Sequence, residues 1–390
     1  MNKQNNSENK NIELNNEHKK SHKSSDLDME GYIFEKPRKR RRTKYKRKKK
    51  IQKILITIGI VILSLIILVG ATFLILKQIG KNEMLDSSKL NIKPPKEVVE
   101  KVEVEEEGRI INYKDGTYKY NDDLTNILFM GIDKNELIED AQIGTAGQAD
   151  SLYLLSIDTK TGENKVMAIS RETMTDIGVF TTSGQYKGTE NKQICLSYAY
   201  GDGGKTSCEN TVKAVSRLIY GVPINSYFSF DIDAISVLND LVGGVQVTAK
   251  QDVALKDKTI KAGETVTLYG DDAETYVRGR DIKVIDSNNN RMDRQIQYIE
   301  SYAKKALQMT KNDLMFPITL YNTASGYMQT DFSVSKVSYL ATTLVENGNV
   351  GLDVEKVKGE VKQGEKYAEF YPDETKLFEQ MLDIFYRKIN

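Results

Sequence analysis

NILFMGID (residues 126–133) is the segment from which the architecture of this chain follows, because it has the pattern of a buried β-strand ending at a glycine and an aspartate. Two more apolar segments come next, SLYLLSI at 151–157 and KVMAI at 165–169, joined through a turn at 158–162. Helical patterns then alternate with strand patterns. The alternation predicts an α/β fold, a three-layer α/β/α sandwich with a central mixed sheet and helices on both faces.

The remaining elements are predicted from the same periodicities and from glycine and proline positions. No further linker is visible, so residues 122–390 are expected to form one domain. We expect helices at 209–220, 234–241, 294–309, 334–346 and 374–389, strands at 227–230, 245–247 and 317–320, and a hairpin at 255–267.

The N-terminal part differs from the rest in charge. Residues 1–77 hold 19 Lys/Arg against 7 Asp/Glu, a net of +12, so the remainder carries −11 of the total of +1. Residues 54–76 are an uncharged apolar run, long enough to cross roughly 30 Å of hydrocarbon. These features predict a disordered basic tail at 1–50, an uncleaved signal anchor at 51–77 and an extracytoplasmic stalk at 78–121.

The basic cluster KPRKRRRTKYKRKKK at 36–50 lies directly before the apolar run. Positive charge next to a span is retained in the cytoplasm, which predicts a single-pass protein of the cell membrane with its C-terminal domain outside. Two alternatives are a buried core helix for the apolar run and a nucleic-acid patch for the cluster. The position of the cluster favours topology and contact with anionic lipid, with no nucleic-acid partner.

Histidine and cysteine positions limit the chemistry. Both histidines, His18 and His22, lie in the tail, so the outer domain has no Ser-His-Asp triad and no His-ligated zinc. Its chemistry must use carboxylates, arginines, lysines, hydroxyls or an oxygen-ligated metal. Cys195 and Cys208 are predicted to form a disulfide across a glycine-containing loop; two separate buried thiols are the alternative.

Charged side chains next to the predicted strands are candidates for a site. Asp133 ends one strand and Asp150 precedes the next, a placement typical of metal and acid/base sites; a turn cap and a surface acid are the alternatives. Arg171 follows KVMAIS directly and is either half of an ion pair or an anion clamp.

The segment VRGRDIKVIDSNNNRMDRQ at 277–295 concentrates arginine. Arg278 and Arg280 would share one face of a strand, and Arg291 and Gln295 share one face at a helix start, where the dipole favours an anion. Guanidinium groups match phosphate oxygens bidentately, so the segment suggests a phosphate site. The alternative is a solvated run in which the arginines pair with Asp281, Asp286 and Asp293.

These segments together resemble the LytR-CpsA-Psr family of bacterial cell-wall enzymes. The resemblance runs from about residue 126 to 307 and keeps the family's order. It is carried by MGID (130–133), Asp150-Ser151, SRET (170–173), YAYG (198–201), GGV (243–245), VRGR (277–280) and RMDRQ (291–295).

The resemblance implies an α/β/α fold that holds a polyprenyl lipid in a hydrophobic tunnel. Its members transfer a sugar polymer with its phosphate from undecaprenyl pyrophosphate to a hydroxyl of peptidoglycan. It thus implies a phosphotransferase, with pyrophosphate hydrolysis as a side activity and Mg²⁺ or Mn²⁺ as cofactor. By position, it implies catalytic roles for Asp133, Asp150 and Arg171, metal binding by Asp133 and Asp286, and pyrophosphate binding by Arg171, Arg278, Arg280, Arg291 and Gln295.

The chain also departs from the family pattern. Gln148 stands where the family has an arginine, Gln193-Ile194-Cys195 replaces lysine-leucine-asparagine, and Asn288-Asn289-Asn290 precedes Arg291. These departures motivate a second hypothesis, a non-catalytic receptor for polyprenyl-linked wall precursors. A third, a transcription regulator acting through the basic tail, lacks a helix-turn-helix pattern.

Overall fold

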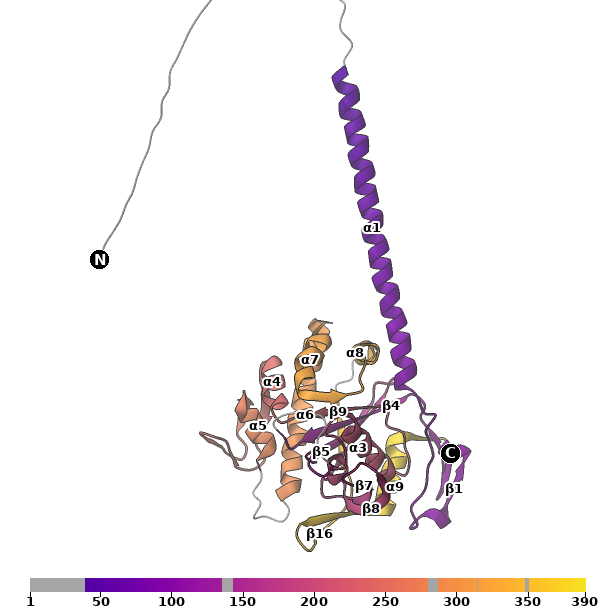
Figure 1. Cartoon of the computed structure of the whole chain (residues 1–390), viewed down its shortest axis with the longest axis vertical. Helices are drawn as coiled ribbons and strands as arrows, with labels where there is room; N and C mark the ends of the chain where they lie inside the picture. Colours follow the sequence, from indigo (N-terminus) through magenta and orange to yellow (C-terminus); the bar gives the residue numbers. More distant parts are fainter. Residues whose placement is uncertain (1–38, 135–142, 280–286, 314, 348–350) are drawn as a thin grey trace, which may run out of the picture. The chain divides into compact units, whose positions relative to one another are not determined.

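The computed structural model describes residues 39–134, 143–279, 287–313, 315–347 and 351–390 (Figure 1). The predicted apolar run lies in the single helix α1 (Lys39–Met84). It is long and apolar enough to cross a membrane, and none of its most apolar 18 residues is buried. A buried core helix is therefore rejected, and α1 is a candidate membrane anchor. The prediction of a disordered tail at 1–50 was wrong for residues 39–50, where the lysines and arginines, which favour helix, continue α1 through the basic segment. Residues 1–38 lie outside the described residues.

A six-stranded mixed sheet forms the centre of the folded domain, in the order β14-β9-β4-β5-β6-β15. The pairs β4–β9 and β6–β15 are parallel, and the other neighbours are antiparallel. The three strands predicted first, β4, β5 and β6, are adjacent in it. The strands are β4 (Leu124–Ile132), β5 (Ala149–Asp158), β6 (Asn164–Ile169), β9 (Ser226–Phe230), β14 (Met328–Thr330) and β15 (Asp353–Lys356).

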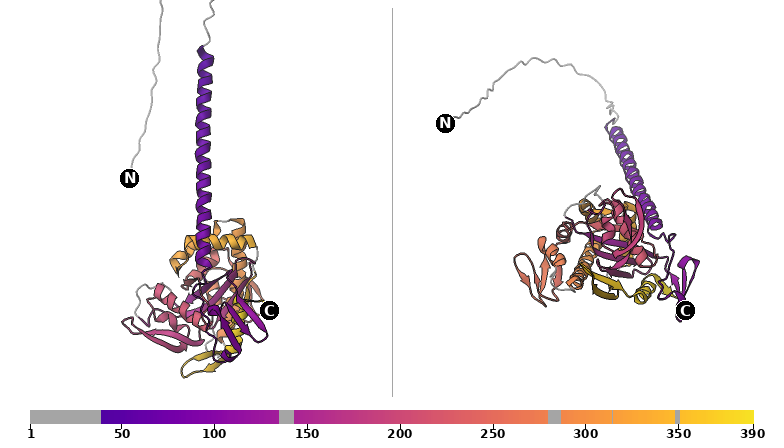
Figure 2. Two further views of the ribbon diagram at one scale, coloured as in Figure 1. Left: turned by 90° about the vertical axis from the view of Figure 1, so that its right-hand side faces the viewer. Right: turned by 60° about the horizontal axis from the view of Figure 1, so that its bottom comes forward.

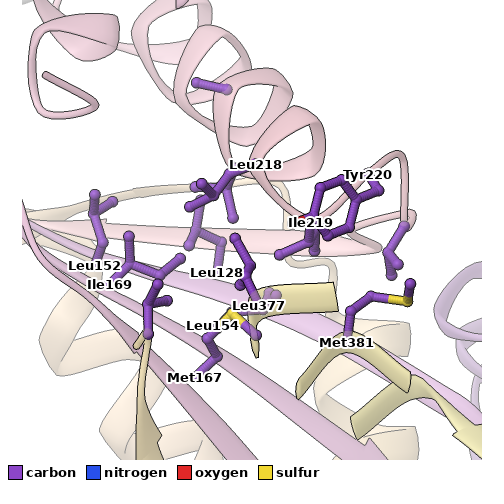
Figure 3. Packing of buried hydrophobic residues seen from close by; sticks show 14 of the residues in the cluster. Leu128, Leu152, Leu154, Met167, Ile169, Leu218, Ile219, Tyr220, Leu377 and Met381 are labelled. Carbon is purple, nitrogen blue, oxygen red and sulfur yellow. The ribbon is translucent and has the colours of Figure 1, made fainter. Parts of the chain in front are cut away.

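One face of this sheet is covered by α3 (Lys205–Leu218) and α9 (Glu374–Phe385). Because side chains alternate along a strand, Leu152 and Leu154 of β5 point to the same side, where they join the main apolar core with residues of both helices. Figure 3 shows Leu218 of α3 and Leu377 of α9 meeting these strand leucines. This layer forms the main buried core of the domain.

The opposite face is covered by α6 (Ser287–Asn312) and α8 (Val334–Asn347). The alternate residue of β5, Tyr153, packs with Met292 of α6, and Ile157 packs with Tyr339 of α8. Phe129 and Leu155, also on this face, are only partly buried. Helices thus cover both faces, which confirms the predicted three-layer α/β/α architecture.

A second, smaller core lies beside the sheet and includes Val247, Tyr276 and Tyr298. Two predictions for this region were wrong. Residues 317–320 are helical rather than a strand, because Pro317 occupies the first turn, where its missing N–H costs nothing. VRGR is not a strand, since α5 runs through Arg278. The elements are α4 (Ala234–Leu241), β10 (Val245–Thr248), β11 (Val253–Ala254), β12 (Thr259–Ile260), β13 (Thr265–Leu268), α5 (Asp271–Arg278) and α7 (Phe316–Ala324).

The segment predicted as a stalk is largely part of the folded domain, so that boundary was wrong. Its strands β1, β2 and β3 form a sheet completed by the C-terminal strand β18, and Figure 2 shows these strands beside the C-terminus. Ile92 and Val98 before them are buried in the main core. The sheet consists of β1 (Val102–Glu105), β2 (Ile110–Tyr113), β3 (Gly116–Tyr120) and β18 (Tyr386–Lys388), the last replacing the end of the helix predicted to 389.

Two hairpins and a short helix complete the domain. The strand β17 meets β7 through a parallel bridge between Phe370 and Thr173. The hairpins are β7 (Met174–Phe180) with β8 (Tyr186–Gln193) and β16 (Gly359–Gln363) with β17 (Ala368–Pro372), and the helix is α2 (Leu196–Ala199).

Candidate active site

Three strands of the central sheet bring charged residues to one edge. In the antiparallel register Ile132 of β4 lies opposite Ala149 of β5, and Leu152 of β5 lies opposite Ile169 of β6. The end of β4, the start of β5 and the end of β6 therefore meet. This places Asp133 and Asp150 at the same sheet edge, as their positions at strand ends had suggested, and it brings Arg171, which the family resemblance grouped with them, to the same edge.

Asp150 lies between two guanidinium groups. Its Oδ1 is 2.5 Å from Nη1 of Arg171, and its Oδ2 is 3.9 Å from Nη1 of Arg291. The side chains of Arg171, Asp150 and Arg291 are 19%, 20% and 10% exposed. We call these three residues the arginine–aspartate cluster. It is sheltered enough for its charges to interact strongly, yet each member still reaches solvent.

The start of α6 positions Arg291. Met292, the next residue, packs against the sheet, which fixes this turn of the helix over β5 and β6. Asn288, one turn earlier, is buried; its Oδ1 accepts a hydrogen bond of 2.9 Å from Nη2 of Arg291, and its Nδ2 donates one of 3.0 Å to Oγ of Ser170. Arg291 is thereby tied through Asn288 to the end of β6.

Arg171 has a similar neutral partner. Its Nη2 donates to Oε1 of Gln148, and Sγ of Cys195 lies 3.8 Å from the same nitrogen. Burial raises the pKa of the Cys195 thiol, and the lowering effect of Arg171 does not offset it. The sulfur is therefore an uncharged neighbour of the guanidinium at neutral pH.

Gln295 lies one turn beyond Arg291 on α6, as its spacing predicted. Tyr153 donates a hydrogen bond of 2.8 Å from its hydroxyl to Oε1 of Gln295. The Nε2 group donates to Oγ of Ser151, at 3.2 Å, and to the carbonyl of Val277, at 3.1 Å. Gln295 thus connects β5 with α5 at the border of the cluster.

Arg278 and Asp133 form the more exposed part of the edge. Nη2 of Arg278 is 3.9 Å from Oδ1 of Asp133, and its Nη1 is 2.6 Å from Oε1 of Glu274 one turn earlier on α5. About half of each of the two side chains, Arg278 and Asp133, is exposed. Because Arg278 ends a helix, the expectation that it shares a strand face with Arg280 was wrong.

Two predicted site residues, Arg280 and Asp286, lie outside the described residues. Within the described ranges, no group of three or more His, Cys, Asp or Glu side chains could hold a metal ion. Among the described carboxylates at this edge, Asp150 faces two guanidinium groups, whereas Asp133 is about half exposed and lies 3.9 Å from a single one, that of Arg278, so Asp133 is better placed to meet a cation. Mg²⁺ commonly binds one or two carboxylates together with substrate phosphates, so this donor set fits a metal that arrives with its ligand.

The predicted disulfide between Cys195 and Cys208 is absent, because both residues are free buried thiols. The loop between them is held in a different way: Ser207 Oγ accepts from the Gly203 amide, and Tyr198 donates to the Gly203 carbonyl, both at 2.8 Å. Cys195 faces Arg171, whereas Cys208 lies on α3 in the main core, where burial raises its pKa to about 12. These hydrogen bonds at Gly203 fix the shape of the loop, so its glycines do not serve to close a disulfide.

The structure adds contacts that the sequence had not marked as parts of the site, those of Gln148, Asn288 and Tyr153. Spacing could have found two of them. Gln148 is two residues before Asp150 in an extended segment, and Asn288 is three residues before Arg291 on a helix, so each shares a face with its charged neighbour. Lys356 also reaches this side from the end of β15, with its Nζ 2.7 Å from Oδ1 of Asp293.

Comparison with known proteins identifies the family of this chain. The model of the LytR_cpsA_psr family matches residues 85–383. The chain belongs to this family. The LytR_cpsA_psr match begins within the segment predicted as a stalk, in agreement with the strands found there.

Curated relatives have transferase names. The polyisoprenyl-teichoic acid–peptidoglycan teichoic acid transferase TagU of Halalkalibacterium halodurans is 29% identical over 187 residues, which is 47% of this chain and 54% of that protein. This chain therefore spans about half the length of that relative. The TagU of Oceanobacillus iheyensis is 26% identical over 307 residues, 77% of this chain and 84% of its own.

Solved structures support the fold. Bacillus subtilis TagV aligns with a TM-score of 0.52 at 22% identity, covering 67% of this chain and 94% of its own. TagT bound to LI-WTA aligns with a TM-score of 0.50 at 20% identity, covering 67% and 89%. At these identities the likeness shows the LytR_cpsA_psr fold alone.

Proposed function

We propose that this protein is a membrane-anchored phosphotransferase that moves a glycopolymer with its phosphate from an undecaprenyl-pyrophosphate carrier to peptidoglycan. The observation that carries the proposal is the arginine–aspartate cluster at the sheet edge, where two sheltered guanidinium groups share one carboxylate. The transferase names of the TagU relatives support the same reaction class.

The cluster is suited to a diphosphate. Arg171 and Arg291 together carry two positive charges against the single negative charge of Asp150. A pyrophosphate offers several oxygens to the planar donors of each guanidinium, which bind phosphate bidentately and stay charged at any physiological pH. The incoming anion would displace Asp150 from at least one arginine. Arg278 and Gln295 border the same edge and would contact the polymer side of the ligand.

The displaced carboxylate suggests the chemistry. The hydroxyl oxygen of the peptidoglycan acceptor attacks the phosphorus that bears the polymer, and the bond from that phosphorus to the bridging oxygen breaks. Polyprenyl phosphate leaves with that bonding pair. Asp150, freed from an arginine, accepts the hydroxyl proton, and the two guanidinium groups stabilise the charge on the leaving phosphate.

A divalent cation fits this scheme as a partner of the ligand. Mg²⁺ or Mn²⁺ would be held by Asp133, with Asp286 as a further predicted ligand, and would neutralise charge on the phosphate oxygens.

The lipid part of the carrier needs an apolar path. The layer between the sheet and helices α6 and α8 contains Phe129, Leu155 and Ile296, which are only partly buried, whereas the sheet leucines under α3 and α9, Leu152 and Leu154, are fully buried. A prenyl chain placed in the looser layer would reach the cluster from the side of α6. The basic segment at 36–50, which precedes the apolar run of α1, supports a cytoplasmic N-terminus, so that the domain would face the cell wall.

The test is turnover by the purified full chain in vesicles that contain a polyprenyl-pyrophosphate-linked glycopolymer and Mg²⁺. Arg171→Ala and Arg291→Ala should each lower transfer to peptidoglycan fragments by about a hundredfold or more, as expected for loss of a charged group at the reacting phosphate. Arg217→Ala, on the exposed face of α3, is the matched control. Full activity in both cluster variants would exclude this site.

A second candidate is a receptor that binds the lipid carrier without turnover. It is motivated by the paired state of Asp150, whose two oxygens both face arginines, so that no free base is displayed before ligand binds. Mass spectrometry of the purified protein distinguishes the two functions. Bound polyprenyl phosphate with no transfer in the presence of Mg²⁺ would favour the receptor.

A further inference from the structure

Each arginine of the cluster is held by a neutral amide oxygen in addition to Asp150. Gln148 Oε1 accepts from Arg171, and Asn288 Oδ1 accepts from Arg291. The two amides come from different elements, one before β5 and one in the first turn of α6. The same arrangement, a guanidinium group that donates to an amide oxygen, thus occurs twice around the Asp150 carboxylate.

The choice of amide matters because an amide and a carboxylate have nearly the same shape but differ by a full charge. A carboxylate at either position would also accept the guanidinium N–H, and it would form an ion pair. That ion pair would cancel part of the charge available to an incoming anion. An amide oxygen fixes the orientation of the guanidinium and leaves its charge in place.

The second contact of Asn288 shows that this residue is oriented. Its Nδ2 donates to Ser170 Oγ, and the Ser170 hydroxyl also accepts from the Glu172 amide. The Asn288 side chain is almost fully buried, at 4% exposure, so it is not free to rotate. Arg291 therefore donates its hydrogen bond to a fixed acceptor, Asn288, which is itself tied to the end of β6.

We propose that Gln148 and Asn288 are positioning residues that hold Arg171 and Arg291 in place for a diphosphate without neutralising them. This inference rests on the proposed function, since it concerns the same anion site. According to this inference, Gln148 and Asn288 help the site to distinguish ligands by their negative charge. A site with two oriented guanidinium groups, whose amide partners add no negative charge of their own, should prefer a diphosphate to a monophosphate.

The test measures binding of geranylgeranyl pyrophosphate and geranylgeranyl monophosphate to the full chain in detergent by calorimetry. Gln148→Glu and Asn288→Asp add one negative charge each within hydrogen-bond distance of an arginine. We expect each to weaken diphosphate binding at least about tenfold, and to weaken monophosphate binding less, because the lost attraction scales with ligand charge. Gln246→Glu, an exposed isosteric change on β10, should change neither affinity.

Asn288→Ala separates charge from scaffolding. It removes both hydrogen bonds but adds no charge, so the proposal predicts that it weakens diphosphate binding less than Asn288→Asp does. A merely structural role predicts the reverse order, because aspartate keeps the acceptor. Thermal unfolding gives an independent check: Asn288→Asp should be at least as stable as the parent while binding the diphosphate less tightly.

The outcomes distinguish a failure of the positioning role from a failure of the proposed function. If the parent binds the diphosphate and both carboxylate variants bind it as tightly, the positioning role is refuted and the proposed function stands. If the alanine variant binds less tightly than the aspartate variant, Asn288 is structural. If the parent binds neither lipid, the proposed function fails, and the inference fails with it.

Discussion

Replacing Asp150 by asparagine should change stability, binding and turnover in different directions. The substitution keeps the shape of the side chain and removes the charge that two arginines share, at 2.5 and 3.9 Å. Two unit charges about 4 Å apart attract by about 4 kcal/mol at an effective dielectric constant of 20. Removing one partner of a fully buried pair costs about 3–5 kcal/mol, and the 10–20% exposure of these side chains reduces this to about 2–3 kcal/mol.

The assay is differential scanning calorimetry with and without geranylgeranyl pyrophosphate. A loss of about 2–3 kcal/mol corresponds to a fall in Tm of about 3–5 °C for a folded domain of about 300 residues. The diphosphate should bind Asp150→Asn more tightly than the parent and restore much of the lost stability, because it replaces the missing negative charge. Transfer activity should fall, because the variant lacks the proton acceptor.

One pattern would refute this reasoning. If Asp150→Asn unfolds at the temperature of the parent and binds the diphosphate no more tightly, then Asp150 does not hold the two arginines. A matched change of an exposed acid that pairs with a lysine, Asp252→Asn, should leave Tm nearly unchanged, since exposed pairs contribute little.

Three further predictions concern the rest of the domain. Burial raises the pKa of Asp231 from its usual 3.8 to about 6, so the folded state binds this proton more tightly, and stability should fall as the pH rises from about 4 to 6. The variant Asp231→Asn can still accept from the Ala234 amide and should remove this pH dependence. Urea unfolding at pH 4 and 7 measures the effect, which is worth at most about 3 kcal/mol. Tyr153→Phe removes the hydrogen bond to Gln295 and should lower turnover about fivefold, equivalent to about 1 kcal/mol, with little loss of Tm; unchanged kinetics would show that Gln295 needs no such support. When the protein is purified without reductant and then denatured, a thiol titration should detect two reactive thiols per chain, those of Cys195 and Cys208. A count of zero would show that the two cysteines form the disulfide after all.

The central sheet could be predicted from the sequence because its strands are buried on both faces. Apolar runs such as 126–132 and 151–157 mark strands whichever face is considered, and the short turn at 158–162 makes β5 and β6 neighbours. Because β4 also pairs with β5 in antiparallel fashion, the end of β4, the start of β5 and the end of β6 share one edge. The strand-end positions of Asp133 and Asp150 could be predicted from the sequence, whereas the ion pair of Asp150 with Arg171 is known from the structure.

Other features depend on contacts that a local pattern does not contain. The segment at 99–120 is charged and resembles a linker, yet it becomes a sheet because β18 from the other end of the chain pairs with it. Residues 317–320 were predicted as a strand, but Pro317 lies in the first turn of the helix α7. Two cysteines separated by glycines suggested a bridge, but hydrogen bonds within the loop direct the sulfurs to different neighbours.

The amide partners of the arginines show a limit of a different kind. Gln148 and Asn288 were noticed as departures from the family pattern, and departures suggested weaker function. In the structure they are acceptors for Arg171 and Arg291. Residue type alone could not show this. Gln148, before β5, accepts from Arg171, which follows β6, and Asn288 accepts from Arg291 one turn further along α6.

A crystal structure of the protein with geranylgeranyl pyrophosphate addresses the central claim most directly. We predict diphosphate oxygens within hydrogen-bond distance of both Arg171 and Arg291, with Asp150 moved away from at least one of them and the prenyl chain between the sheet and α6. A diphosphate bound elsewhere, with both arginines still paired to Asp150, would contradict the account.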